Sequence, residues 1–130
     1  MKKKVRQKQS LKNSFRVAFS GLKHGIFKER NSRIMFVVSC IVITVSFILR
    51  ISKLEMLVIA TTCFFVIILE MINTSVEKLL DVLYPNHHPE IGLVKDIMSG
   101  MVLLGSILAV VVGFIILWNP LIRFVMQVVK

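Results

Sequence analysis

Five polar side chains recur at helical spacing in a segment that begins as strongly apolar sequence. Their spacing of i, i+3, i+4, i+7 and i+11 places them on one narrow face of a helix, here called the polar stripe: Glu70, Asn73, Thr74, Glu77 and Asp81. Because a helix rises about 1.5 Å per residue, Glu70 is expected to lie roughly 10 Å deeper in the apolar zone than Glu77. Such carboxylates could provide a buried general base beside a site for a divalent cation.

Further polar residues are expected to approach the polar stripe from other parts of the chain. Lys95, Asp96 and Ser99 begin the next expected helix, and Glu29 precedes the first apolar run. The charge of Lys95 could neutralise a phosphate group. The sequence contains no Gly-x-x-x-x-Gly-Lys loop and no protein-kinase motif, so phosphoryl transfer here would need a different phosphate-binding structure.

The segment YPNHHPE, residues 84–90, separates the polar stripe from Lys95. Its two prolines and its asparagine predict a loop, with the next helix beginning near Leu93. His87 and His88 are adjacent in this loop, which is poor geometry for two ligands of one metal ion. We therefore interpret them as ordinary loop residues or as nucleotide contacts before zinc is considered.

The elements that position these residues follow from hydropathy, since 55% of the chain is hydrophobic, too large a share for an ordinary soluble domain. Three apolar segments predict membrane helices over 34–51, 56–80 and 93–118. The segment 10–30 alternates apolar and basic residues at helical spacing, as in a helix that lies on a membrane surface. We expect one all-α domain over 1–130, in which a basic tail over 1–9 precedes this surface helix.

Basic residues are concentrated at the N-terminus. The first 33 residues contain eleven Lys or Arg and a single acid, Glu29. Because basic flanks stay on the cytoplasmic side of a membrane, the N-terminus and the polar stripe are both expected to face the cytoplasm. The net charge of +10 is better explained by anionic lipid headgroups than by nucleic acid, which we do not expect as a partner.

Two motifs of the chain resemble a known family. The pattern ExxNTSVExxxD at residues 70–81, followed by HPEIGLVKDIMSG at 88–100, closely resembles the prokaryotic diacylglycerol kinases, which are small lipid kinases of bacterial membranes. The resemblance covers roughly residues 15–118, including GLKHGIFKERNSR before the first membrane segment. It implies a multi-pass protein of the bacterial inner membrane that forms a homotrimer, with active sites shared between neighbouring subunits.

The resemblance also implies roles for individual residues. Glu70 matches the catalytic base, where the lipid substrate binds, and Asn73 matches an active-site amide. Glu29 and Glu77 match the pair that holds Mg²⁺ against the phosphates of ATP. The other ATP contacts implied by the resemblance are Asn86, His87, His88, Lys95 and Asp96. Ser99 matches a contact to the lipid substrate.

The resemblance has two departures on the surface helix. Ser10 and Val17 stand where some relatives have an arginine and an aromatic residue that touch substrate or nucleotide. The His-Pro pair at 88–89 is more similar to the Gram-positive branch of the family, whose members resemble undecaprenol kinases.

The resemblance implies ATP- and Mg²⁺-dependent phosphorylation of a membrane lipid alcohol. Undecaprenol is the expected acceptor, giving undecaprenyl phosphate, and diacylglycerol, giving phosphatidic acid, is the alternative. A hypothesis of another class is a non-catalytic scaffold or ion-conducting bundle in which Glu70 lines a polar path. That hypothesis gives no reason for the other polar residues to collect on the cytoplasmic side, and a measurement of ATP binding separates the two.

Overall fold

The computed structural model describes residues 10–86 and 88–129, and most of them are helical. The four helices are α1 (Leu11–Phe27), α2 (Arg30–Ile48), α3 (Lys53–Leu83) and α4 (Pro89–Val128). Helices α2, α3 and α4 are each long and apolar enough to cross a membrane. The prediction of an all-α protein with three membrane-length helices and an N-terminal amphipathic helix is confirmed. The predicted basic tail lies outside the described residues.

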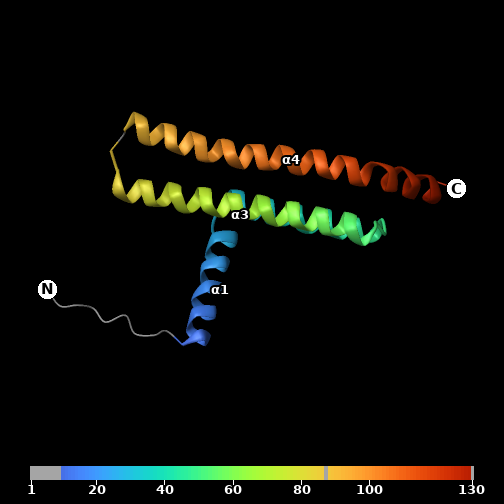
Figure 1. Cartoon of the computed structure of the whole chain (residues 1–130), viewed down its shortest axis with the longest axis horizontal. Coiled ribbons are helices and arrows are strands. Elements are labelled where there is room, and N and C mark those ends of the chain that lie inside the picture. The colour runs from blue at the N-terminus through green and yellow to red at the C-terminus, as the bar shows by residue number, and fades with distance from the viewer. Residues whose placement is uncertain (1–9, 87, 130) are drawn as a thin grey trace.

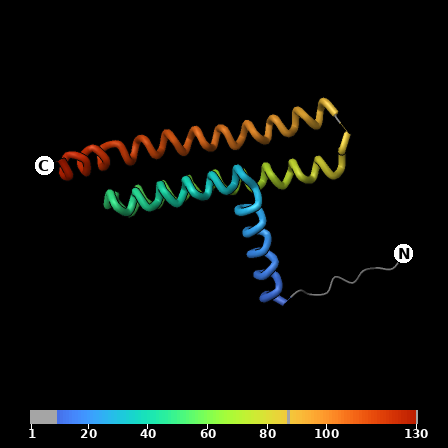
Figure 2. The backbone as a smooth tube through the Cα atoms, turned by 180° about the vertical axis from the view of Figure 1, so that it is seen from behind, coloured from blue at the N-terminus to red at the C-terminus, as the bar shows by residue number. Residues whose placement is uncertain are grey.

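The bundle is built on α3, which contacts α2 on one side and α4 on another. Helix α1 leaves this bundle steeply, partway along its length, so that it stands across the direction of the other helices (Figures 1 and 2). None of the residues of α1 is buried. An amphipathic helix that crosses a membrane bundle and buries no side chain against it has the geometry of a helix lying at the membrane surface.

Helix α3 begins earlier than the sequence analysis predicted because its first turn is capped. The Ser52 side chain accepts a hydrogen bond from the Glu55 backbone N–H at 3.3 Å, and the Glu55 carboxylate accepts one from the Ser52 N–H at 2.8 Å. This reciprocal pair is a capping box, which satisfies two backbone donors that a helix leaves free. Arg50, in the turn before it, has a left-handed backbone with a φ of 50°.

Helix α4 extends beyond its predicted bounds at both ends. Pro89 occupies the start of the helix, where a missing N–H costs no hydrogen bond, so Pro89 and Glu90 belong to α4 and not to the predicted loop. At the other end α4 continues past Trp118 and through Pro120 to Val128. We call residues 119–128 the overhang, because they lie beyond the predicted end of this helix. The end of α4 extends past the end of α3 in both views (Figures 1 and 2).

The helices approach one another through small side chains. The buried residues of α2 are three serines at seven-residue spacing: Ser32, Ser39 and Ser46. A seven-residue period keeps one side of a helix toward its neighbour, and small residues let two backbones come close. On α4, a Cβ at Gly105 would lie 2.7 Å from the Leu69 side chain, whereas one at Gly113 would meet nothing within 4 Å. Of these two glycines of α4, only Gly105 therefore stands at a close contact with another helix.

The outside of the bundle is apolar, and its inside is partly polar. Among the described residues the buried apolar side chains are Ile59, Val66, Ile67 and Val102, while large apolar residues on every helix are exposed. Burial of so few apolar groups would not stabilise a protein of this size in water. It suits a bundle whose apolar surface is covered by lipid and whose helices are held by packing and polar contacts.

Ser46, one of the three buried serines of α2, allows a test of the packing between α2 and α3. Ser46 is fully buried, and its hydroxyl already donates to the Val42 carbonyl at 2.8 Å. Ser46→Ala is expected to cost under about 1 kcal/mol, because it removes one hydrogen bond within the helix. Ser46→Leu is expected to cost about 1–3 kcal/mol, because the larger side chain forces the helices apart. Unfolding titrations in mixed micelles measure the free energy of unfolding of each variant. Equal stability of the two variants would show that the helices are not closely packed at Ser46.

Candidate active site

The polar stripe runs along α3 from a buried end to an exposed end. Glu70 is 3% exposed and Asn73 is 6% exposed, whereas Glu77 is half-buried and Asp81 is exposed. Within the described residues, no side chain donates a hydrogen bond to the Glu70 carboxylate. A buried carboxyl without such a donor is free to exchange a proton with a substrate group that reaches it from the apolar side.

Asn73 connects the buried end of the polar stripe to Glu77. Its Nδ2 donates a hydrogen bond to Glu77 Oε1 at 3.2 Å, one helical turn away. Its Oδ1 is buried and accepts no hydrogen bond from the described residues. Because an unpaired buried acceptor costs about 1–3 kcal/mol, this oxygen is a position at which a hydroxyl donor or a cation would be stabilising.

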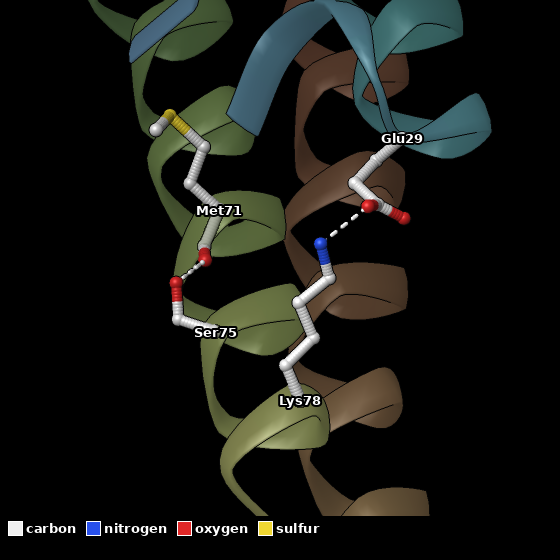
Figure 3. Close-up of polar contacts among 4 residues, drawn as sticks. All are labelled: Glu29, Met71, Ser75 and Lys78. Carbon is white, nitrogen blue, oxygen red and sulfur yellow. Dashed lines mark hydrogen bonds and ion pairs between the residues drawn. The ribbon is translucent and has the colours of Figure 1, made fainter. Parts of the chain in front are cut away.

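Glu29 stands at the junction of α1 and α2 and contacts α3, the helix that carries the polar stripe. The Lys78 ammonium lies 2.5 Å from Glu29 Oε1 and donates a hydrogen bond to it (Figure 3). This hydrogen bond is the main reason why the pKa of Glu29 is lowered from its ordinary value, and the charges of Lys78, His24 and Arg33 act in the same direction. Glu29 is therefore ionised at neutral pH.

Lys78 is the functional candidate that the sequence analysis missed. It stands one position after Glu77 and so does not share the face of the polar stripe. Its partner, Glu29, is 49 residues away in the chain. One signal was available: Lys78 is the single Lys or Arg between Lys53 and Lys95, and it lies among carboxylates.

The structure brings together three of the predicted acids. Glu70 lies close enough to Glu77 and to Glu29 for their charges to repel its own. Glu77 is on the same helix as Glu70, whereas Glu29 stands at the junction of α1 and α2. Lys78 pairs with Glu29, but Glu70 and Glu77 have no ion pair within the described residues, so this part of the polar stripe attracts positive charge.

The start of α4 is linked to the exposed end of the polar stripe by one ion pair, in which the Lys95 ammonium contacts the Asp81 carboxylate. His87 lies outside the described residues. The remaining predicted contacts are exposed and, within the described residues, have no hydrogen bond or ion pair to the polar stripe: Asn86, His88, Asp96 and Ser99. Within one chain, Lys95 is therefore joined to the polar stripe, and Asn86, His88, Asp96 and Ser99 are not.

The carboxylates fit a magnesium ion that arrives with its phosphates. Across residues 10–86 and 88–129, no three His, Cys, Asp or Glu side chains are arranged as a complete metal site. Mg²⁺ commonly takes one or two carboxylates and completes its shell with water and phosphate oxygens. Glu29, Glu77 and the unpaired Asn73 Oδ1 are donors of the required kind. Mg²⁺ on Glu29 would replace its contact with Lys78.

A hollow beside these residues separates α1 from α3. It has a volume of about 580 Å³ and is lined by His24 and Gly25 of α1 and by Met71, Thr74 and Lys78 of α3, among others. The two helices are in close contact at Gly25, where a Cβ would lie 2.8 Å from the end of the Met71 side chain. Figure 3 shows Met71 one turn before Ser75 and about two turns before Lys78 on the same helix. Lys78 lines the hollow and contacts Glu29, so the hollow adjoins that carboxylate.

Removal of the Lys78 charge tests what holds α1 in place. Lys78→Met is expected to increase backbone hydrogen exchange in the second half of α1 at pH 7. Overall stability should change little, because the ion pair is partly exposed. Lys23→Met, an exposed lysine of α1, is the matched control. Equal exchange in wild type and Lys78→Met would show that the ion pair does not restrain α1.

The same ion pair predicts a dependence on pH. Because the folded protein lowers the pKa of Glu29, the contribution of the pair is present above the ordinary carboxyl pKa and is lost as pH falls through the lowered value. Exchange of α1 in the wild type is therefore expected to approach that of Lys78→Met in acid. If α1 still exchanged more slowly in the wild type than in Lys78→Met at a pH well below this range, the Glu29–Lys78 ion pair would not be the contact that restrains α1.

The fold and the site together define the class of the protein. It is a small membrane protein. Its candidate site contains carboxylates, an amide and two lysines, and it lies in the half of the bundle next to the α3–α4 connection. A family model described as prokaryotic diacylglycerol kinase matches residues 16–117 of this chain. The chain belongs to the prokaryotic diacylglycerol kinase family.

Three relatives show how the family varies. The chain is 36% identical over 109 residues to a diacylglycerol kinase of Synechocystis sp., covering 83% of this chain and 62% of that protein. It is 27% identical over 108 residues to an undecaprenol kinase of Bacillus subtilis, covering 80% and 88%. It is 30% identical over 112 residues to a diacylglycerol kinase of Haemophilus influenzae, covering 86% and 91%. The relatives are lipid kinases by name, and their named lipids differ.

Proposed function

We propose that this protein transfers the γ-phosphate of ATP to the hydroxyl group of a membrane lipid alcohol, in a reaction that requires Mg²⁺. The observation that carries the proposal is the position of Glu70, a buried carboxyl in a membrane-length helix within range of Glu77 and Glu29. A lipid hydroxyl approaches such a group from the bilayer, while ATP approaches the exposed acids from water. Membership of a lipid kinase family supports the same reaction.

Glu70 acts as the general base in this proposal. Its carboxylate accepts the proton of the lipid hydroxyl as the oxygen attacks the γ-phosphorus. Asn73, whose buried Oδ1 has no partner within the described residues, lies one helical turn from Glu70 and positions the bound lipid alcohol. Bond formation and departure of ADP then depend mainly on positioning and on stabilisation of the phosphate charge.

Glu29 and Glu77 would hold Mg²⁺ in this proposal, and the ion would neutralise charge on the phosphate oxygens. Lys78, when released from Glu29, lies beside the same phosphates and offsets their charge. Lys95 has the equivalent role at the start of α4, where it now contacts Asp81. The nucleotide contacts that complete the site are Asn86, His87, His88 and Asp96.

A homotrimer with shared sites is part of the proposal. Asp96 and Ser99 are exposed on α4 and have no hydrogen bond or ion pair to the polar stripe within the described residues of one chain. Residues that serve an active site but lie apart from it in one chain are expected where a neighbouring subunit completes the site. Ser99 would then contact the lipid bound at the Glu70 of a neighbouring subunit.

The proposed location is the bacterial inner membrane, with the N-terminus and the site in the cytoplasm. The eleven basic residues among the first 33 support this orientation, because basic flanks are retained on that side. ATP is then supplied directly from the cytoplasm. The turn between α2 and α3 and the overhang of α4 consequently face the outer side.

Undecaprenol is the acceptor that we propose first, on the basis of the His-Pro pair before α4. Diacylglycerol is the second candidate, and it is favoured by two relatives named diacylglycerol kinase. The test is transfer of the ATP γ-phosphate to each lipid, side by side in mixed micelles, with and without Mg²⁺. Faster transfer to one lipid identifies the acceptor. Transfer to neither, with no binding of ATP by the folded protein, would support the non-catalytic scaffold or channel.

A further inference from the structure

A second polar hollow lies at the other end of the bundle from the active-site candidates. It has a volume of about 730 Å³ and is enclosed by the α2–α3 turn on one side and by the end of α4 with its overhang on the other. Its polar lining comes from Arg50 and Ser52 of the turn, from Glu55 of α3, and from Asn119, Arg123 and Gln127 of α4. Glu55 precedes Glu70 by fifteen residues, or roughly 22 Å along the helix. The hollow is therefore separate from the proposed catalytic site.

Two arginines provide the charge of this hollow. Within the described residues, neither Arg50 nor Arg123 forms an ion pair at contact distance. The turn holds Arg50 in the left-handed region, with a φ of 50°, where residues other than glycine are uncommon. A residue kept in such a conformation at the mouth of a cavity is a reason to examine that cavity for a function.

The single carboxylate of the lining does not neutralise both arginines. Glu55 lies near enough to Arg123 to feel its charge. However, Glu55 Oε2 accepts the hydrogen bond of the Ser52 N–H in the capping box, so its position is fixed by the start of α3. Two guanidinium groups against one carboxylate leave an excess positive charge. Guanidinium groups bind phosphate with paired hydrogen bonds, which makes a phosphate group the complementary ligand.

The rest of the lining matches a lipid better than a free ion. Ile48, Ile115 and Phe124 form an apolar wall beside the arginines. Arginines beside apolar side chains are typical of the ends of membrane helices, at the depth of phospholipid headgroups. Trp118, directly before the overhang, is an aromatic residue of the kind that marks this depth.

We propose that this hollow binds the headgroup phosphate of an anionic phospholipid. Arg50 and Arg123 hold the phosphate oxygens, and the apolar wall contacts the first methylene groups of the acyl chains. The excess positive charge favours a lipid with net negative charge over a zwitterionic one. The inference does not depend on the proposed kinase activity, because none of these residues has a part in it.

The single tryptophan of the chain provides the measurement. The full chain is reconstituted in phosphatidylcholine vesicles, and phosphatidylglycerol brominated near the headgroup is added in increasing fraction. Bromine quenches tryptophan at short range, so the quenching of Trp118 reports which lipid occupies this end of the bundle. Brominated phosphatidylglycerol is expected to quench at lower mole fraction than brominated phosphatidylcholine. A contribution of about 1 kcal/mol from each arginine corresponds to about a fivefold preference per arginine.

Two substitutions remove the guanidinium groups. Arg123→Gln is expected to lower the preference about fivefold. Arg50→Gly should do the same without straining the turn, because glycine adopts a left-handed backbone readily. Circular dichroism of each variant establishes that it is folded. If both folded variants keep the preference of the wild type, the arginines do not hold the lipid and the proposal is wrong.

Lys53→Gln is the matched control, since Lys53 is a cation at the same end of the bundle that does not line the hollow. It is expected to retain most of the preference. A loss equal to that of Arg123→Gln would attribute the effect to general surface charge and overturn the proposal. Abolition of the preference by excess inorganic phosphate would assign the hollow to free phosphate instead of a lipid. Equal quenching by both brominated lipids in the wild type would also overturn it.

Discussion

Glu70→Gln is expected to reduce phosphoryl transfer by about 10²–10⁴-fold, the range typical for loss of a general acid–base group. Glutamine has nearly the same shape as glutamate but cannot accept the proton of the lipid hydroxyl. Because Glu70 is 3% exposed and receives no hydrogen bond from the described residues, the neutral amide fits without breaking an ion pair. Folding and ATP binding should therefore be retained. The measurement is Mg²⁺-dependent transfer to undecaprenol and diacylglycerol, together with ATP binding to the same preparation.

Glu55→Gln is the control for this substitution. It makes the same chemical change on the same helix, at the opposite end of the bundle, and glutamine also serves in a capping box. Its activity should be close to that of the wild type. If Glu70→Gln retained near-normal turnover, the base would have to be another group. If it lost ATP binding as well, Glu70 would act in nucleotide binding or in folding.

Glu77→Gln is expected to have a different effect: ATP binding should require a higher concentration of Mg²⁺. Replacement of one of two carboxylate ligands should raise the Mg²⁺ concentration for half-maximal binding at least about 10–100-fold, since even second-shell partners of metals have effects of this size. The Asn73 Nδ2 hydrogen bond can be kept, because the side-chain oxygen of glutamine also accepts. A titration of ATP binding with Mg²⁺ measures the change without requiring turnover.

Asp81→Asn is the control on the same polar stripe. Asp81 contacts Lys95 and has no predicted role in metal binding. Its substitution should leave the Mg²⁺ concentration for half-maximal binding unchanged, while the release of Lys95 alters the affinity for ATP itself. If Glu77→Gln and Asp81→Asn gave the same titration as the wild type, the proposed metal site on Glu77 would be wrong. A shift in Asp81→Asn alone would move the metal site toward the start of α4.

Features that depend on one helix could be predicted from the sequence. The shared face of Glu70, Asn73 and Glu77 follows from spacing alone, and the membrane-length helices follow from hydropathy. The predicted start of α3 at residue 56 is too late, because the capping box of Ser52 and Glu55 begins the helix at Lys53. The predicted end of α4 at residue 118 is too early, because the helix passes through Asn119 and Pro120, which interrupt the apolar run.

Contacts between helices could not be predicted in the same way. The pairing of Lys78 with Glu29 depends on the rotation of α3 about its axis and on the angle at which α1 meets the bundle. The pairing of Lys95 with Asp81 depends on the length of the α3–α4 connection, which spans residues 84–88, whereas the predicted helices leave 81–92 between them. Spacing along one helix carries no information on either quantity. The three-dimensional structure was needed to identify Lys78 as part of the candidate site.

The length of α4 has a consequence for the membrane around the protein. Forty helical residues span about 60 Å, roughly twice the hydrocarbon thickness of a bilayer. The overhang still exposes large apolar side chains, such as Phe124 and Met126. A thin bilayer would leave these side chains in water unless α4 tilts or the lipids stretch, and a thicker bilayer would cover them. Hydrophobic mismatch at one end of α4 therefore makes the tilt of this helix, and with it the position of Lys95 at the other end, respond to membrane thickness.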